Sequence, residues 1–306
     1  MHQRTTFFLL AAGVMACLAG TPGNAQARPA TDSSHLVATP EHADRASMET
    51  MQIPSHGALM NALVYVAAGA GPHPAVILLH GFPGNERNLD LAQDMRRAGW
   101  DVLYFNYRGS WGTPGDFSFS HGIEDTAAAL AYLRQPDVAK KLRLDPTRIV
   151  LIGHSMGGFM TVQGAAADPA IKAFATISAA DMGGTMQQML GEGQKPDALH
   201  KMSAGLANEG MAPLGGCTPD GLAHELAEHA ATWTFGSKVA ALKNRTALIV
   251  TSDDGLAKAN ESFAADLRNA GDTHVTTVHL PTDHAYSDQR IELSHAVLQW
   301  LAALPK

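Results

Sequence analysis

Cysteine is scarce in this chain, where only Cys17 and Cys217 occur among 306 residues. Two cysteines allow at most one intrachain bridge, which excludes a disulfide-rich scaffold. Like charges are not clustered, and the net charge of −7 excludes the basic footprint of a protein that binds nucleic acid or an anionic membrane. Long hydrophobic runs are also lacking. The apolar run at residues 7–18 is too short to span a bilayer comfortably, so we expect no stable membrane span.

The first 27 residues have the layout of an export signal. A basic start at Arg4 precedes the apolar run 7–18, and small residues end at Ala25-Gln26-Ala27. This layout predicts cleavage after Ala27 and a periplasmic or secreted protein. Anchoring as a lipoprotein acylated at Cys17 is the alternative, which the poor lipobox before Cys17 disfavours. Removal of the signal would leave Cys217 without a partner.

The rest of the chain divides by its pattern. Residues 28–50 are polar and are expected to form a flexible leader, and residues 51–306 to form one folded domain. Strand-like runs such as AVILL and RIVLIG alternate with helical stretches, and several of these runs are apolar throughout. Such strands are typical of a parallel sheet covered by helices on both faces. The alternation stops at about 182–235, which we interpret as a helical insertion capping the sheet.

A serine between glycines follows one of the apolar strands, in the sequence IVLIGHSMGGFM. The pattern G-x-S-x-G between a strand and a helix predicts a strained elbow that exposes Ser155 at the carboxyl end of the sheet. Gly153 and Gly157 would leave room for close backbone approach. A serine hydroxyl needs a base to become a nucleophile, so we expect a histidine and an acid further along the chain.

His284 is the expected base, because it lies after the last predicted strand and before the last helix. This gives the chain order serine, acid, histidine. The acid should follow the strand TALIVT, where Asp253 and Asp254 are adjacent. Asp254 is preferred, Asp253 remains close behind it, and Asp181 is a third alternative.

Two backbone N–H groups are needed to hold a developing oxyanion. Met156, directly after the serine, is expected to supply one. The loop HGFPG should supply the other, from Phe82, since Pro83 has no N–H. A second loop, NYRGSWGTPG, is expected at the same edge of the sheet, where Trp111 and Arg108 would form substrate-binding wall. For Arg108, a buried structural ion pair is the alternative.

The stretch HELAEH at residues 224–229 is similar to a zinc motif, but its histidines are five apart instead of four. No phosphate-binding glycine loop or dinucleotide fingerprint occurs either. The sequence therefore calls for no metal and no cofactor.

The motifs HGFPG, GHSMGG, SDDG and DHAYSD, in this order, resemble those of the α/β-hydrolase superfamily. With NYRGSWGTPG, they are also similar to the catalytic domain of the prolyl-oligopeptidase family and related esterases, without the propeller. The resemblance implies the α/β-hydrolase fold and a serine hydrolase that cleaves an ester, thioester or amide.

Three functions are therefore carried forward. The first is an exported carboxylesterase that cleaves small acyl esters with Ser155, His284 and Asp254, the methionines of the insertion giving an adaptable apolar wall. The second uses the same residues as a serine peptidase or acyl-aminoacyl amidase. The third is a non-catalytic binding module on a hydrolase scaffold.

Overall fold

The computed structural model describes residues 44–305. The expected signal at 1–27 and the leader up to residue 43 lie outside the described residues. Strand β1 (Ser47–Ser55) begins inside the stretch 28–50 that the sequence pattern assigns to the leader. Ser47 to Thr50 pair in register with Val66 to Leu63, so this part of the expected leader is a strand of the sheet.

Within residues 44–305, eight strands form one sheet in the order β1-β2-β4-β3-β5-β6-β7-β8. After β1 the strands are β2 (Ala58–Val66), β3 (His73–Leu79), β4 (Asp101–Phe105), β5 (Leu144–His154), β6 (Ala173–Ile177), β7 (Thr246–Thr251) and β8 (Val275–His279). The pairs β1–β2 and β2–β4 are antiparallel and all later pairs are parallel. The expected mostly parallel sheet is confirmed, and residues 44–305 contain no β-propeller.

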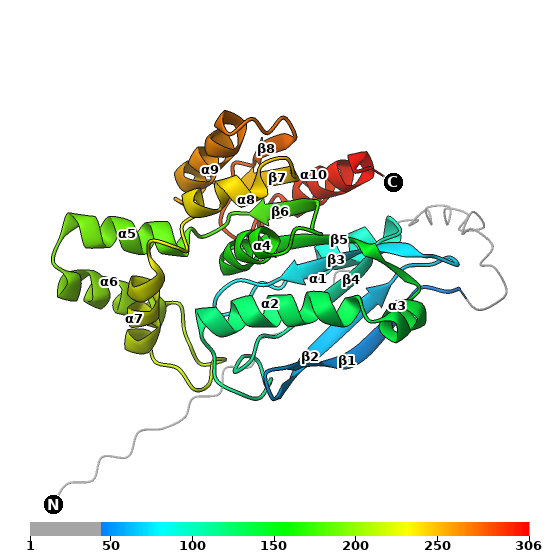
Figure 1. The fold of residues 1–306 in the computed structure, drawn as a ribbon, viewed down its shortest axis with the longest axis horizontal. Coiled ribbons are helices and arrows are strands. Elements are labelled where there is room, and N and C mark those ends of the chain that lie inside the picture. Colours follow the sequence, from blue (N-terminus) through cyan, green and yellow to red (C-terminus); the bar gives the residue numbers. More distant parts are fainter. Residues whose placement is uncertain (1–43, 306) are drawn as a thin grey trace, which may run out of the picture. The chain divides into compact units, whose positions relative to one another are not determined.

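The helices follow the strands along the chain (Figure 1). They are α1 (Leu89–Arg97), α2 (Phe119–Leu133), α3 (Pro136–Leu142), α4 (Met156–Ala167), α5 (Met182–Glu192), α6 (Lys195–Asn208), α7 (Pro219–His229), η2 (Gly236–Lys238), α8 (Val239–Leu242), α9 (Ala257–Asn269) and α10 (Arg290–Ala303). None of the helices in the described part of the chain is long and apolar enough to cross a bilayer.

Both faces of the sheet are covered, as alternate residues of β3 demonstrate. Val76 and Leu78 pack in a buried cluster with α1 and α10, whereas Ile77 and Leu79 pack in a second cluster with α2, α4 and α9. Neighbouring side chains of a strand point to opposite faces. A strand covered on both faces must therefore be apolar at every position, which explains the continuous run in β3.

Three helices, α5, α6 and α7, separate β6 from β7 along the chain. We call them the cap helices. They gather beyond one end of the sheet, where α7 contacts the N-terminal end of α2 (Figure 1). Residues of α5 and α6 line the same cavity as Ser155, which places these two helices at the carboxyl ends of the parallel strands.

Candidate active site

Ser155 occupies the sharp turn between β5 and α4. Its backbone has φ 57° and ψ −122°, a conformation that non-glycine residues adopt only when the surrounding structure imposes it. Two hydrogen bonds fix the turn from β6 and the residues after it. The Ser155 N–H donates to the Ile177 carbonyl at 2.9 Å, and the Ala180 N–H donates to the Ser155 carbonyl at 3.0 Å.

The glycines around the serine are required by close backbone approach. A Cβ atom on Gly153 would lie 1.9 Å from the carbonyl oxygen of Gly157. A Cβ on Gly157 would lie 2.0 Å from the carbonyl oxygen of Leu79, on the adjacent strand. Side chains at these two positions would push α4 away from the sheet. The glycines therefore explain how the elbow can pack against its neighbours.

His284 and Asp254 form a close pair, although they come from different loops. The distance from His284 Nδ1 to Asp254 Oδ2 is 2.7 Å. The Asp254 side chain is 3% exposed and that of His284 is 42% exposed, so the acid is enclosed while the ring faces solvent. Burial acts to raise the pKa of Asp254, but hydrogen bonds from His284, Ser178 and the Leu256 N–H outweigh it and hold that pKa well below its usual value.

The two alternative acids face other groups. Asp253 lies 3.3 Å from His279 Nε2, on the exposed surface. Asp181 caps α5, because its carboxylate accepts from the Gly184 N–H at 2.9 Å and the Phe235 N–H at 3.2 Å. Of the three acids considered from the sequence, Asp254 is the one that the structure pairs with His284.

A cavity of about 560 Å³ brings the predicted residues together. Its lining residues are Phe82, Ser155, Met156, Ala180, Met182, Thr185, Met189, Lys201, Met202, Gly205, Leu206, Glu209, Asp254, Leu256 and His284. The loop after β3, the elbow, the cap helices α5 and α6, and the loops after β7 and β8 all contribute. Met156 is the first residue of α4, where backbone N–H groups have no partner within the helix.

His154 has a role that reasoning from the sequence missed. Its ring lies 4.6 Å from that of His284, measured between centroids, and its Nε2 lies 2.8 Å from the His284 carbonyl oxygen. A carbonyl can only accept, so Nε2 carries the proton. Burial, with a smaller effect of His284, lowers the pKa of His154 to about 4. The sequence signal for this contact is the position of His154 directly before Ser155.

Arg108 and Trp111, which the sequence analysis expects to form substrate-binding wall, do not line this cavity. The Arg108 Nε lies 2.6 Å from Asp125, whose side chain is fully buried, and a second guanidinium nitrogen contacts Glu124. The Trp111 Nε1 donates to the Pro83 carbonyl at 2.8 Å, and Arg87 stacks over the Trp111 ring. Both side chains are thus committed to structural contacts.

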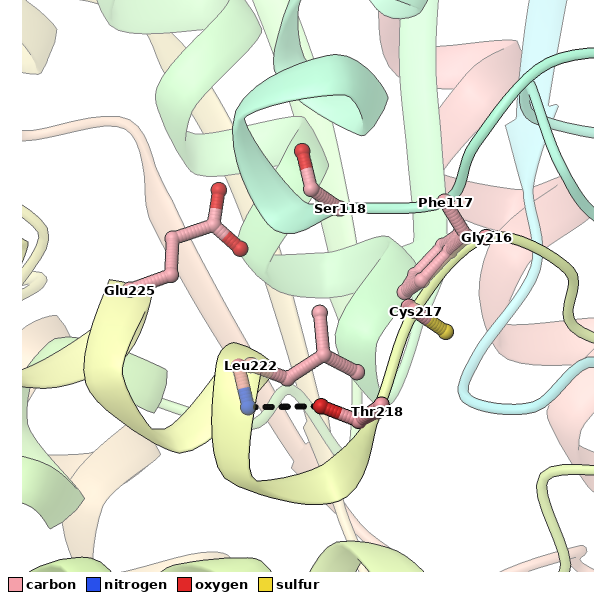
Figure 2. Close-up of a pocket in the computed structure, with 8 residues that line it drawn as sticks. Phe117, Ser118, Gly216, Cys217, Thr218, Leu222 and Glu225 are labelled. Atoms are coloured by element: carbon pink, nitrogen blue, oxygen red, sulfur yellow. Dashed lines mark hydrogen bonds between the residues drawn. The ribbon is translucent and has the colours of Figure 1, made fainter.

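A second hollow of about 550 Å³, whose lining does not include Ser155, lies between α2 and α7 (Figure 2). Cys217 is among the residues that line it, and burial raises the pKa of its thiol. No histidine is among the lining residues. The Glu225 carboxylate accepts from the N–H groups of Phe119 and Ser120 at 2.9 and 2.8 Å. Glu225 therefore caps the N-terminus of α2 and joins α7 to it. The hollow holds no nucleophile with a base beside it.

Metal-ligating groups are not assembled among residues 44–305, where no three His, Cys, Asp or Glu side chains come together suitably. The stretch HELAEH lies on α7. Its second histidine, His229, stacks on Trp233 with a centroid separation of 4.2 Å. This histidine is therefore engaged in packing.

Comparison with known proteins gives one family and several structures. The family model of the α/β-hydrolase fold matches residues 74–214. An uncharacterized protein of Mycobacterium tuberculosis is 35% identical over 100 residues, which are 32% of this chain and 33% of the relative. The alignment thus spans about a third of that relative's length.

The solved structures match over most of their length. An esterase of Pyrococcus furiosus aligns over 84% of this chain and 91% of its own, with 15% identity and a TM-score of 0.61. Est1E from Butyrivibrio proteoclasticus aligns over 83% of this chain and 97% of its own, with 20% identity and a TM-score of 0.61. A fungal esterase from Rhizomucor miehei aligns over 85% of this chain and 84% of its own, with 19% identity and a TM-score of 0.62. With its eight-stranded sheet, its serine elbow and these matches, the chain has the α/β-hydrolase fold.

Proposed function

We propose that this protein is an exported serine carboxylesterase in which Ser155, His284 and Asp254 form the catalytic triad. The observation that carries the proposal is the shared cavity, which Ser155 lines together with a histidine held by a buried carboxylate at 2.7 Å. Because Asp254 holds Nδ1 of His284, the ring nitrogen left for proton exchange is Nε2. The fold supports the same proposal, since the elbow is where hydrolases of this architecture carry their nucleophile.

The reaction follows from these groups. His284 Nε2 takes the hydroxyl proton of Ser155 as Oγ attacks the acyl carbon, which forms a tetrahedral oxyanion. The carbon–oxygen bond of the ester then breaks, and His284 gives the proton to the departing alcohol. A water molecule repeats the sequence on the acyl-enzyme, releasing the carboxylic acid and returning the proton to Ser155. Asp254 stays ionised throughout and stabilises the imidazolium.

The oxyanion would be held by the N–H groups of Phe82 and Met156. Both residues line the cavity beside Ser155. Met156 begins α4, so its N–H lies at the positive end of the helix dipole. Preorganised donors of this kind stabilise the transition state more than the ground state.

The acyl group would contact the apolar wall from the cap helices and the loop after β7. This wall includes Met182, Met189, Met202, Leu206 and Leu256. Methionine adapts to differently shaped apolar groups, so we infer a substrate with a short to medium acyl chain or an aromatic acid. Est1E from Butyrivibrio proteoclasticus has been solved with ferulic acid bound, which makes a feruloyl ester a useful probe.

Export is supported by the residue pattern at 1–27, with its basic start, apolar run and Ala-Gln-Ala site. The matching experiment is expression of the full chain followed by cell fractionation and mass measurement of the product. We expect a chain that begins at Arg28 outside the cytoplasm. An uncleaved cytoplasmic product would overturn the export part of the proposal.

Enzyme activity is tested with Ser155→Ala, and Ser262→Ala on the exposed face of α9 serves as the matched control. We expect turnover of a p-nitrophenyl butyrate solution to fall by about 10³-fold or more in Ser155→Ala and to stay unchanged in the control. A fluorophosphonate probe should label Ser155 alone, by mass mapping. Full turnover by Ser155→Ala would reject the mechanism, and failure to label would favour a non-catalytic scaffold.

Substrate class is tested separately on the wild-type protein. Acetyl, butyryl, octanoyl and feruloyl esters are compared with aminoacyl amides of matched size. A higher kcat/KM for the esters is the expected result. Faster cleavage of the amides would replace the esterase assignment with a peptidase or acyl-aminoacyl amidase.

A further inference from the structure

The last residue of β5, His154, is fixed in place by the sheet. Its backbone pairs in register with Ile177 of β6. Side chains alternate along a strand, so His154 lies on the same side as Ile152, which packs in the buried cluster with α1 and α10. Tyr286, from the loop before α10, packs in that cluster too. The loop that carries His284 therefore meets the sheet on the side where His154 lies.

Two contacts join His154 to His284. The Nε2 of His154 donates to the His284 carbonyl oxygen at 2.8 Å, and the two ring centroids lie 4.6 Å apart with the planes tilted by 40°. His154 is only 3% exposed, whereas the side chain of His284 is 42% exposed. A ring held in the interior thus covers part of a ring that is open to solvent elsewhere.

The hydrogen bond to Asp254 does not by itself fix the His284 imidazole. That bond restrains Nδ1 at 2.7 Å, and the ring can still turn about the line that joins the two atoms. The proposed proton transfer needs the other nitrogen, Nε2, directed at the Ser155 hydroxyl, and a misplacement of about 1 Å can slow a reaction by about 100-fold. A neighbour packed against the ring limits this turn, and a hydrogen bond to the His284 carbonyl limits movement of the loop.

We propose that His154 is a positioning residue that holds the His284 imidazole between Asp254 and Ser155, an inference that rests on the proposed function. His154 acts through His284 and is not among the residues that line the cavity. Because one strand end carries both His154 and the proposed nucleophile, the contact relates the position of the elbow directly to the loop after β8. The separation of nucleophile and base is then set by a buried ring as well as by the two loops.

The charge state of His154 suits this position. Burial lowers its pKa to about 4, so the ring is neutral at neutral pH. In the proposed mechanism His284 becomes an imidazolium each time it takes a proton. A second positive charge 4.6 Å away, between ring centroids, would oppose that step, and the neutral ring avoids this repulsion.

A second contact to the same loop comes from Arg290 of α10. Its Nη1 donates to the Ala285 carbonyl oxygen at 3.0 Å. This hydrogen bond restrains the backbone one residue after His284, on the opposite side of that residue from Asp283. The contacts of His154 differ, because they restrain the backbone of His284 and also its ring. Substitution of His154 should therefore disturb the imidazole even while Arg290 holds the loop.

Two substitutions in the full chain separate the two contacts. His154→Gln keeps a side-chain N–H at a similar distance from the backbone and removes the ring, whereas His154→Phe keeps a ring and removes the N–H. The matched control is His295→Gln, at an exposed position of α10. Urea unfolding at neutral pH shows whether each variant folds. If His154→Phe does not fold, because the His284 carbonyl has lost its donor, His154→Gln alone decides.

Two esters with the same acyl group report on the position of the His284 ring. p-Nitrophenolate departs without a proton, whereas the alkoxide of an ethyl ester needs one from His284 Nε2. We expect kcat/KM to fall about tenfold for p-nitrophenyl butyrate and about 100-fold for ethyl butyrate in both His154 variants. The control should keep both values. A smaller amount of folded enzyme would lower the two values by the same factor.

Wild-type kcat/KM for both esters in the folded His154 variants would overturn the proposal. Equal losses for the two esters would also overturn it, because they indicate less active enzyme and not a displaced imidazole. A greater loss for the ethyl ester in one variant only would support the proposal and identify which contact holds the ring. Failure of the proposed function is recognised separately, by full turnover in Ser155→Ala. A dead Ser155→Ala beside unaffected His154 variants would reject the positioning role and leave the esterase intact.

Discussion

The imidazole of His154, buried at the end of β5, donates from Nε2 to the carbonyl oxygen of His284 at 2.8 Å, 130 positions further along the chain. This contact links the residue beside the proposed nucleophile to the loop that carries the proposed base. Burial lowers the pKa of His154 to about 4, so the folded ring carries a single proton at neutral pH. Protonation of this ring would place a charge in an apolar interior, which connects stability to pH.

Stability should fall as the pH drops from 6.5 towards 4. In that window an unfolded His154 binds a proton and the folded one does not, so acid favours the unfolded chain. Burial also lowers the pKa of His80 to about 4, so this residue makes stability depend on pH in the same direction. Between pH 7.5 and pH 5, each of these two histidines should lower the free energy of unfolding by about 2 kcal/mol. Urea unfolding at both pH values should show that His154→Asn loses less unfolding free energy between them than wild type does. The exposed control His295→Gln should lose as much as wild type.

Asp254→Asn should lower kcat/KM by about 10³- to 10⁴-fold, because an amide would favour the wrong tautomer of His284. Asp253→Asn, the matched neighbour, should leave activity unchanged, since Asp253 faces His279 at the surface. Steady-state kinetics on the same ester measure both. Equal losses in the two variants would contradict the assignment of the acid.

Gly153→Ala should prevent native folding or lower the melting temperature strongly. Its Cβ would lie 1.9 Å from the Gly157 carbonyl oxygen, a separation that only movement of α4 can relieve. Gly191→Ala on α5 is the control, because a Cβ there meets nothing within 4 Å. We expect the control to be neutral or to gain about 0.5–1 kcal/mol from reduced backbone entropy. Calorimetry measures both, and a native-like Gly153→Ala would show that the elbow tolerates a side chain.

Arg108→Met should destabilise the protein by about 3–5 kcal/mol, because it leaves the buried Asp125 carboxylate without its cation. KM for a neutral ester should not change, since Arg108 does not line the cavity with Ser155. Chemical denaturation and kinetics at low temperature separate the two effects. A raised KM with unchanged stability would restore Arg108 to the substrate-binding wall.

The parts of the fold that local patterns specify could be read from the sequence. Apolar runs such as that of β3 reflect burial on both faces, and the elbow at Ser155 is marked by its own glycines. Residue assignments that depend on the direction of a side chain were harder to predict from the sequence. Asp253 and Asp254 are adjacent and chemically alike, so their sequence left the acid open, and only the loop conformation separates them.

Contacts between distant positions were harder still. The partner of Arg108, Asp125, lies 17 positions away on α2, and no local pattern marks a buried ion pair. The Ser178 hydroxyl likewise contacts Ser252 and Tyr286, which lie 74 and 108 positions further along the chain. Strand β1 begins at Ser47 because it pairs with β2, although the polar composition there is typical of a leader.

The placement of the cap helices has an evolutionary consequence. One uninterrupted segment between β6 and β7 supplies most of the cavity's methionines, whereas Ser155, Asp254 and His284 come from loops elsewhere in the chain. Insertions, deletions or recombination within that segment would reshape the proposed acyl-contacting wall while leaving the proposed catalytic triad untouched. Substrate range could thus diverge through changes in one segment of the gene. Selection on that segment would be separate from the selection that preserves the proposed catalytic residues.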